Sequence, residues 1–125
     1  MIEAVFFDLF ETLLSLYNPL RPVGPSIAER LGLDPAAFDA HWRLLRRLRY
    51  VGAFPDYRDA LRGISRTLHA TPDERVIEQL YEERRAIFLE ACARTSDEVV
   101  ALLARLRGLG IRLPVISNSV AEFVE

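Results

Sequence analysis

The chain has 125 residues, which is the length of one domain or of part of one. Half of its residues are hydrophobic and 27% are charged, a composition typical of a globular protein and not of a disordered or fibrous one. A net charge of −2 gives no global electrostatic reason to expect a nucleic acid or an anionic membrane as partner, so neither is predicted. The apolar runs are too short for a transmembrane helix and no basic signal-peptide segment opens the chain, so a cytoplasmic protein is expected.

The first predicted element is a strand over residues 2–9. A short apolar run rich in β-branched and aromatic residues is typical of a strand buried on both faces, as in a parallel sheet. Prolines and glycines punctuate residues 13–23 and predict a loop there.

From Pro25 onward the apolar period is helical, which predicts a short helix over residues 25–31 and four more helices after it. Asp34 followed by Pro35 indicates the start of a helix that runs to residue 52, and Asp56 indicates the cap of the next. Residues 71–74 and 95–98 have the spacing of capping boxes, which predicts a long helix through residue 93 and a last one to residue 108 or 110.

The period returns to that of a strand over residues 111–116, and the run Ser117-Asn118-Ser119 follows it. The order is therefore strand, a block of helices, one further helix and strand. This order predicts an α/β fold class, as a parallel βαβ crossover with a helical insertion in its first loop.

Polar side chains follow both predicted strands at their carboxyl ends, where ligands bind in open parallel sheets. Asp8 and Thr12 follow the first strand, and Ser117 and Asn118 follow the second. A carboxylate at the end of a buried strand is costly unless it is bonded or used, which favours a site. The alternative is that Asp8 caps a turn and that Ser117 and Asn118 form another turn.

These strand ends resemble two sequence motifs of the haloacid dehalogenase-like (HAD) superfamily. Residues 5–14 are similar to its first motif, an apolar strand followed by Asp-x-x-x-Thr-Leu, and residues 115–118 are similar to its second, an apolar strand ending in Ser and Asn. The resemblance covers nearly the whole chain. It implies a Rossmann-like parallel sheet, of which only the first strands are present, with an inserted helical cap. The implied division is a partial core of residues 1–14 and 95–125 and a cap of residues 15–94.

The resemblance implies that Asp8 is the nucleophile of a hydrolase and forms a covalent aspartyl intermediate that water then hydrolyses. Thr12 would bond near the nucleophile, and Ser117 and Asn118 would bind the leaving or transferred group.

Residue 10 distinguishes two subclasses within the superfamily. HAD phosphatases carry a second Asp there to protonate the leaving group, whereas 2-haloacid dehalogenases carry an aromatic residue; here it is Phe10. Trp42-Arg43 resembles a Trp-Arg pair on the first cap helix of those dehalogenases, which would make Phe10 and Arg43 substrate-binding residues. The alternative for Arg43 is a solvated charge on an arginine-rich face. Glu11 departs from the pattern, because the position is commonly Gly in dehalogenase-like members.

We therefore expect a dehalogenase-type hydrolase that acts on a small halocarboxylate without a cofactor. A first alternative is a phosphatase of a small phosphate ester, in which Asp8 would help to bind Mg²⁺. A second is a non-catalytic module, because the superfamily's third and fourth motifs, a Lys and an acidic pair, are absent and all sixteen basic residues are arginine. The sequence is thus expected to be a fragment with doubtful activity of its own, or to form a homo-oligomer that covers the exposed sheet edge.

Overall fold

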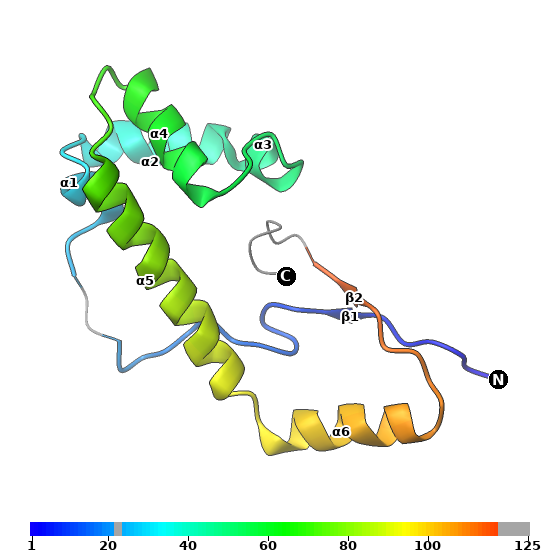
Figure 1. The fold of residues 1–125 in the computed structure, drawn as a ribbon. Helices are drawn as coiled ribbons and strands as arrows, with labels where there is room; N and C mark the ends of the chain where they lie inside the picture. The colour runs from blue at the N-terminus through cyan, green and yellow to red at the C-terminus, as the bar shows by residue number, and fades with distance from the viewer. Residues whose placement is uncertain (22–23, 118–125) are drawn as a thin grey trace. The chain divides into compact units, whose positions relative to one another are not determined.

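A computed structural model describes residues 1–21 and 24–117 of the chain (Figure 1). In these residues the elements run from one short strand through six helices to a second short strand, so the chain is a mixed α/β protein. Two compact units form. The sheet unit holds residues 1–21 and 86–117, and the helical unit holds residues 24–85. The HAD-like division into a core (1–14 and 95–125) and a cap (15–94) stays a prediction.

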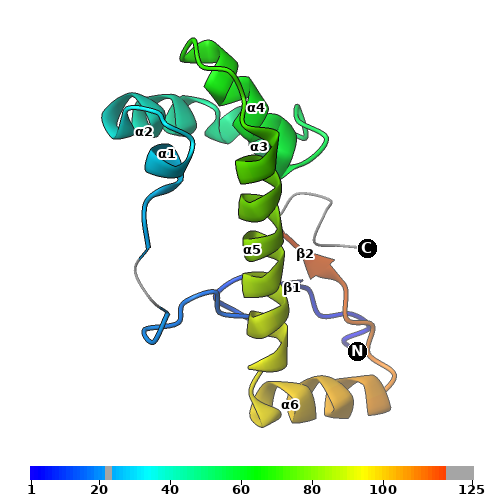
Figure 2. The ribbon, with the colours of Figure 1, turned by 60° about the vertical axis from the view of Figure 1, so that its left-hand side comes forward.

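The strands of the sheet unit pair in parallel, as predicted. Strand β1 (Phe7–Asp8) lies beside β2 (Val115–Ile116), with their residues aligned in that order (Figure 1 and Figure 2). An isolated bridge between Ala4 and Arg112 extends the pairing toward the start of both predicted strands. The regular strands are shorter than the predicted ranges 2–9 and 111–116.

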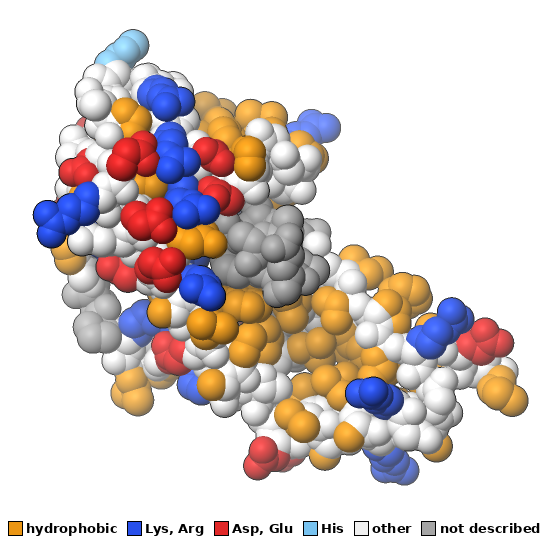
Figure 3. All heavy atoms as spheres, in the orientation of Figure 1, with side chains coloured by type: hydrophobic (Ala, Val, Ile, Leu, Met, Phe, Trp, Pro, Cys, Tyr) orange, Lys and Arg blue, Asp and Glu red, His pale blue; other side chains and the backbone are white. Residues whose placement is uncertain are grey.

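The predicted burial of the first strand on both faces is wrong. The exposed fractions are 70% for Ile2, 64% for Phe6 and 61% for Ile116, which belongs to the partner strand. Ala91 is the one fully buried residue among those described in this unit, and Figure 3 shows hydrophobic side chains on its surface. Burial on both faces needs layers on both sides of the sheet, and the described residues do not supply them.

The helices lie between the two strands in the sequence. Their bounds are α1 Ile27–Arg30, α2 Pro35–Leu44, α3 Arg46–Tyr50, α4 Tyr57–Thr67, α5 Glu74–Ala93 and α6 Asp97–Gly108. The helix predicted to run to residue 52 divides at Leu45 into α2 and α3. Gly52, with a φ of 73°, follows α3 in the left-handed conformation that glycine adopts without strain. Within the described part of the chain, none of the helices combines the length and apolarity needed to cross a bilayer.

The predicted caps of the second and fourth helices are confirmed. The Asp34 carboxylate accepts a hydrogen bond from the backbone N–H of Ala37 (2.8 Å), at the start of α2. The Asp56 carboxylate accepts from the backbone N–H groups of Arg58 and Asp59, at the start of α4. These bonds satisfy backbone donors that the first helical turn leaves without a partner.

The predicted capping boxes are displaced along the chain. Asp73 accepts from the second and third backbone N–H groups after it and caps α5, so this cap lies two residues beyond Thr71. Ser96 accepts from the backbone N–H of Val99 and caps α6, one residue beyond the predicted box start. In both places another short polar side chain stands near the expected cap, and only the backbone decides which of them is positioned to accept.

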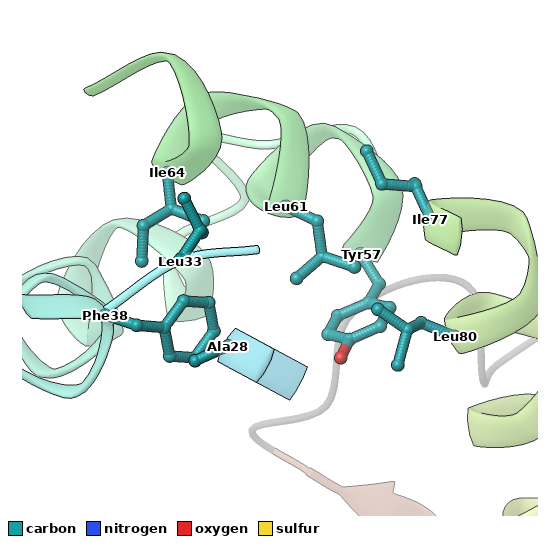
Figure 4. Packing of buried hydrophobic residues seen from close by; sticks show 8 residues of the cluster. All are labelled: Ala28, Leu33, Phe38, Tyr57, Leu61, Ile64, Ile77 and Leu80. Atoms are coloured by element: carbon teal, nitrogen blue, oxygen red, sulfur yellow. The ribbon is translucent and has the colours of Figure 1, made fainter. Parts of the chain in front are cut away.

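The core of the helical unit is a single cluster to which α1, α2, α4 and α5 contribute. Leu61 and Ile64 on α4 and Ile77 on α5 are completely buried. Figure 4 shows them with the rest of the cluster, Ala28, Leu33, Phe38, Tyr57 and Leu80. Ion pairs such as Arg62–Glu74 lie around this core, and acidic and basic side chains alternate over the surface of the helical unit (Figure 3).

Candidate active site

Asp8 lies at the carboxyl end of β1, as the sequence predicts. The parallel register aligns it with Ile116, and Ser117 follows directly after β2. Asp8 is exposed, and its Oδ1 accepts a hydrogen bond from the backbone N–H of Leu9 (2.8 Å). Because the carboxyl ends of parallel strands lie at the same edge of a sheet, Asp8 and Ser117 lie at one edge. Asn118, the fourth predicted catalytic residue, lies outside the described residues.

A compact turn over residues 9–14 follows the nucleophile candidate. The carbonyl oxygen of Leu9 accepts from the backbone N–H groups of Leu13 (3.0 Å) and Leu14 (2.9 Å). Thr12 is exposed in this turn. Among the described residues no hydrogen bond joins Thr12 to Asp8, so the role of Thr12 beside the nucleophile stays a prediction.

Glu11 has a positive φ of 56°, in the left-handed region that glycine occupies most readily. Its carboxylate accepts from the Ser15 hydroxyl (2.9 Å) and from the backbone N–H of Leu16 (3.1 Å). The Glu11 side chain thus joins the turn to the residues that follow it, Ser15 and Leu16. The backbone conformation gives a physical reason why glycine suits this position.

We expect Glu11→Gly to be more stable than Glu11→Ala by about 1 kcal/mol in free energy of unfolding. Both variants lose the two carboxylate hydrogen bonds and differ from each other only in the Cβ, which is strained at a φ of 56°. Urea unfolding of the two variants, followed by circular dichroism, measures the difference. Equal stabilities would mean that the turn does not hold this conformation in solution.

A surface hollow of about 260 Å³ lies between the turn and the start of α6, within the sheet unit. The hollow combines hydroxyl groups with one guanidinium and one carboxylate. Its lining residues are Glu11, Thr12, Leu13, Leu14, Ser15, Ala91, Arg94, Thr95, Ser96 and Val99. Asp8 and Ser117 are not among the described residues that line it, so this hollow and the predicted nucleophile are separate features.

Glu90 on α5 holds the chain that follows the turn. Its carboxylate accepts from the Asn18 side-chain amide (2.6 Å) and from the Arg21 guanidinium (3.3 Å), and it pairs with Arg94 on its own helix. The hydrogen bond from Asn18 and then that from Arg21 lower the pKa of Glu90. The loop is therefore tied to the helix by charge-assisted bonds within one unit.

Phe10, predicted to contact substrate, packs inside the sheet unit. Its half-buried ring meets the ring of Phe88 edge-to-face, with 6.1 Å between centroids and 72° between planes. Arg43, the second predicted substrate contact, is exposed on α2, and its Nε donates to the carbonyl of Asp39 (3.2 Å). Arg43 belongs to the helical unit and Asp8 to the sheet unit. That both contact one substrate therefore stays a prediction.

The sequence predicts no binding role for Arg49, which belongs to the arginine-rich face around Arg43, yet Arg49 is the more unusual cation of the two. Its guanidinium carbon lies 3.8 Å from the centre of the Trp42 ring, and its Nε is buried without a hydrogen-bond partner. A signal was available, because residues seven apart lie on the same face of a continuous helix. The four arginines of residues 43–49 obscured it.

No family model matches this chain, and neither the known proteins nor the solved structures searched include one similar to it. The site is therefore interpreted from its own residues. Among the residues that the structure describes, no group of three His, Cys, Asp or Glu side chains is placed to hold a metal ion.

Proposed function

We propose that the chain is part of a HAD-type hydrolase in which Asp8 forms a covalent ester with a small halocarboxylate. The observation that carries this proposal is the parallel alignment of β1 with β2, which brings Asp8 and Ser117 to one edge of the sheet. In this proposal the sheet unit is the beginning of the Rossmann-like core, the helical unit is the cap, and the protein acts in the cytoplasm.

The proposed reaction begins with attack by an Asp8 carboxylate oxygen on the carbon that bears the halogen. A carbon–oxygen bond forms, the carbon–halogen bond breaks, and the halide leaves with the bonding electron pair. Water then hydrolyses the ester, which restores the Asp8 carboxylate and releases a 2-hydroxy acid and a proton. Ser117 would donate a hydrogen bond to the substrate carboxylate. Phe10 cannot donate a proton, and a halide leaving group requires none.

A Mg²⁺-dependent phosphatase is the alternative within the same class. Asp8 would then attack phosphorus and bind the metal ion, which would neutralise charge on the transferred group. A phosphate ester needs a general acid to protonate its leaving alkoxide, and the residue two after Asp8 is Phe10, which cannot transfer a proton. For that reason we place it second.

A non-catalytic module is the third candidate, and two observations favour it. The 125 residues contain no lysine to offset the charge of an aspartyl intermediate. Apolar side chains in and beside the strands are exposed, among them Phe6 directly before β1 and Ile116 in β2, and a second copy of the chain could cover them. This candidate predicts an oligomer in light scattering and no turnover.

The test compares two substrates on the same protein. With 2-chloropropionate we expect chloride release or, if the ester is not hydrolysed, an increase in the intact protein mass from the alkylated carboxylate. EDTA should change neither result. Phosphate release from a chromogenic phosphate ester, lost on adding EDTA, would overturn the dehalogenase assignment. A protein that gives neither product nor adduct would favour the non-catalytic candidate.

A further inference from the structure

We propose that the outer surface of residues 43–51, where α2 ends and α3 follows, docks the protein on an anionic membrane. All residues of this α2–α3 surface belong to the helical unit. The inference goes beyond the proposed hydrolase function and does not depend on Asp8. It rests on the local charge of this segment, on its unpaired arginines and on the apolar side chains that lie exposed among them.

Positive charge is concentrated in this part of the chain. Four of the sixteen arginines lie within residues 40–55, whereas all eighteen acidic residues lie outside that range. The net charge of −2, which by itself gives no reason to expect an anionic membrane, therefore combines a basic segment with an acidic remainder. An anionic membrane responds to the local charge, because at physiological salt a charge is screened within about 8 Å.

The exposed arginines of the α2–α3 surface have no carboxylate partner among the described residues. Arg46 and Arg47 form no ion pair there, and the Nε of Arg43 donates to a backbone carbonyl oxygen (3.2 Å). Arg58 and Arg62 of the same unit, by contrast, each pair with two carboxylates. The chain thus neutralises two of its guanidiniums and leaves those of the α2–α3 surface to an external anion.

The exposed large hydrophobic side chains of the helical unit also gather here. Among its described residues they are Leu44, Leu48, Tyr50 and Val51, with exposed fractions of 76%, 46%, 59% and 70%. Figure 3 shows hydrophobic side chains at the end of the unit where α3 lies. Exposed apolar side chains that gather in one place mark an interaction surface, whereas scattered ones need no explanation.

The backbone carries α2 into α3 with little interruption. Leu45, the residue between them, keeps a right-handed helical conformation (φ −74°, ψ −8°), and its carbonyl oxygen accepts from the backbone N–H of Arg49 (2.9 Å). The guanidinium of Arg49 stacks on the Trp42 ring, 3.8 Å from its centre, and so holds α3 to α2. The two helices therefore present one firmly held surface.

On this surface the apolar side chains form a stripe with arginine beside it. Leu44, Leu48 and Val51 are four and three residues apart, a spacing that places them on one helical face. Arg47 lies three residues after Leu44 and four before Val51, so it borders the stripe. An apolar stripe bordered by arginine is the pattern of a helix that lies in the plane of a membrane, where apolar side chains enter between the lipid head groups and guanidiniums remain at the phosphates.

Other partners satisfy only part of this pattern. A nucleic acid would pair with the arginines and leave the aliphatic stripe without an apolar contact. A second copy that docked the same surface would bring like charges together. An acidic polypeptide would need a groove of its own to receive the outside of a helix. An anionic membrane offers phosphates and an apolar layer together, so we assign the surface to it.

Vesicle flotation tests the assignment with the full chain. The vesicles contain phosphatidylserine and phosphatidylcholine in equal parts, or phosphatidylcholine alone. We expect the chain to float with the anionic vesicles, to remain below with the neutral ones, and to float less as salt is added. Aggregated protein sediments, so flotation distinguishes membrane binding from self-association.

The arginines are tested by Arg46→Gln combined with Arg47→Gln, which should weaken binding about fivefold for each charge removed. Arg66→Gln combined with Arg75→Gln is the matched control, because both residues are exposed in the same unit and the same charge is lost. This control should float as the unchanged protein does. Equal losses in the two double variants would overturn the assignment, because the net charge and not this surface would then govern binding.

The apolar stripe is tested by Leu44→Gln, which should also weaken flotation, whereas Leu89→Gln on α5, at an exposed fraction of 55%, should not. Circular dichroism checks that every variant is folded. Equal flotation with neutral vesicles, or binding to polyglutamate without flotation, would overturn the assignment, the second in favour of an acidic polypeptide. Asp8→Asn should float as the unchanged protein does, so failure of the hydrolase proposal and failure of membrane docking are separate results.

Discussion

Replacing Leu61 by alanine is expected to lower the free energy of unfolding of the helical unit by about 2–5 kcal/mol. Leu61 lies on α4 with an exposed fraction of 0%, inside the cluster shown in Figure 4. Truncation removes buried methyl groups and leaves a cavity that the surrounding side chains fill only in part. The loss is large compared with the total stability of a small domain, so a substantial unfolded population is expected at moderate temperature.

Urea unfolding followed by Trp42 fluorescence and by circular dichroism measures this effect. Trp42 is a suitable reporter because it packs against the same cluster. Leu44→Ala provides the matched control, since Leu44 is a leucine of the same unit with an exposed fraction of 76%; its effect should stay within about 0.5 kcal/mol. Similar values for both variants would show that the cluster is not the core of the helical unit in solution.

The helical unit was largely predictable because its signals are local. Asp34 and Asp56 cap helices where they were expected to, since a short acceptor side chain acts on backbone groups only two or three residues away. The spacing of Tyr57, Leu61 and Ile64 likewise identifies the buried face of α4. Helix caps and the spacing of apolar residues along a helix depend little on the rest of the chain.

The sheet unit was less predictable, because strand burial depends on what lies above and below the sheet. The apolar run of residues 2–9 correctly predicted parallel pairing, yet Ile2 and Phe6 are exposed. The conformation of the turn after Asp8 could not be predicted from the sequence either. Neither the positive φ of Glu11 nor the carboxylate bonds that close its loop follow from the motif that contains it. These features belong to the backbone of the turn and to the loop that follows it.

The candidate site was predicted only in its framework. The positions of Asp8 and Ser117 at one sheet edge follow from two strand ends in parallel order. The stacking of the Arg49 guanidinium on the Trp42 ring joins α3 to α2, and the helical period by itself does not place the guanidinium over the ring. Side chains that act through tertiary packing are the ones that sequence reasoning misses.

Asp8→Asn is expected to abolish the proposed chemistry, lowering ester formation and halide release by about 10⁴-fold or more. An amide oxygen has too little nucleophilicity to displace a halide, so the substitution removes the proposed nucleophile. The measurement is intact mass after incubation with 2-chloropropionate, together with chloride release. Glu3→Gln, which also removes an exposed carboxylate near β1, should keep both signals.

The same substitution separates a catalytic role from a structural one. Asp8 is exposed, and its described hydrogen bond comes from the adjacent backbone N–H of Leu9, which an asparagine oxygen can also accept. The free energy of unfolding of Asp8→Asn should therefore equal that of the unchanged protein within about 0.5 kcal/mol. An undiminished adduct in Asp8→Asn would remove Asp8 from the role of nucleophile. Marked destabilisation would instead show that the Asp8 carboxylate contributes to folding beyond the hydrogen bond from Leu9, because a dispensable exposed carboxylate contributes little.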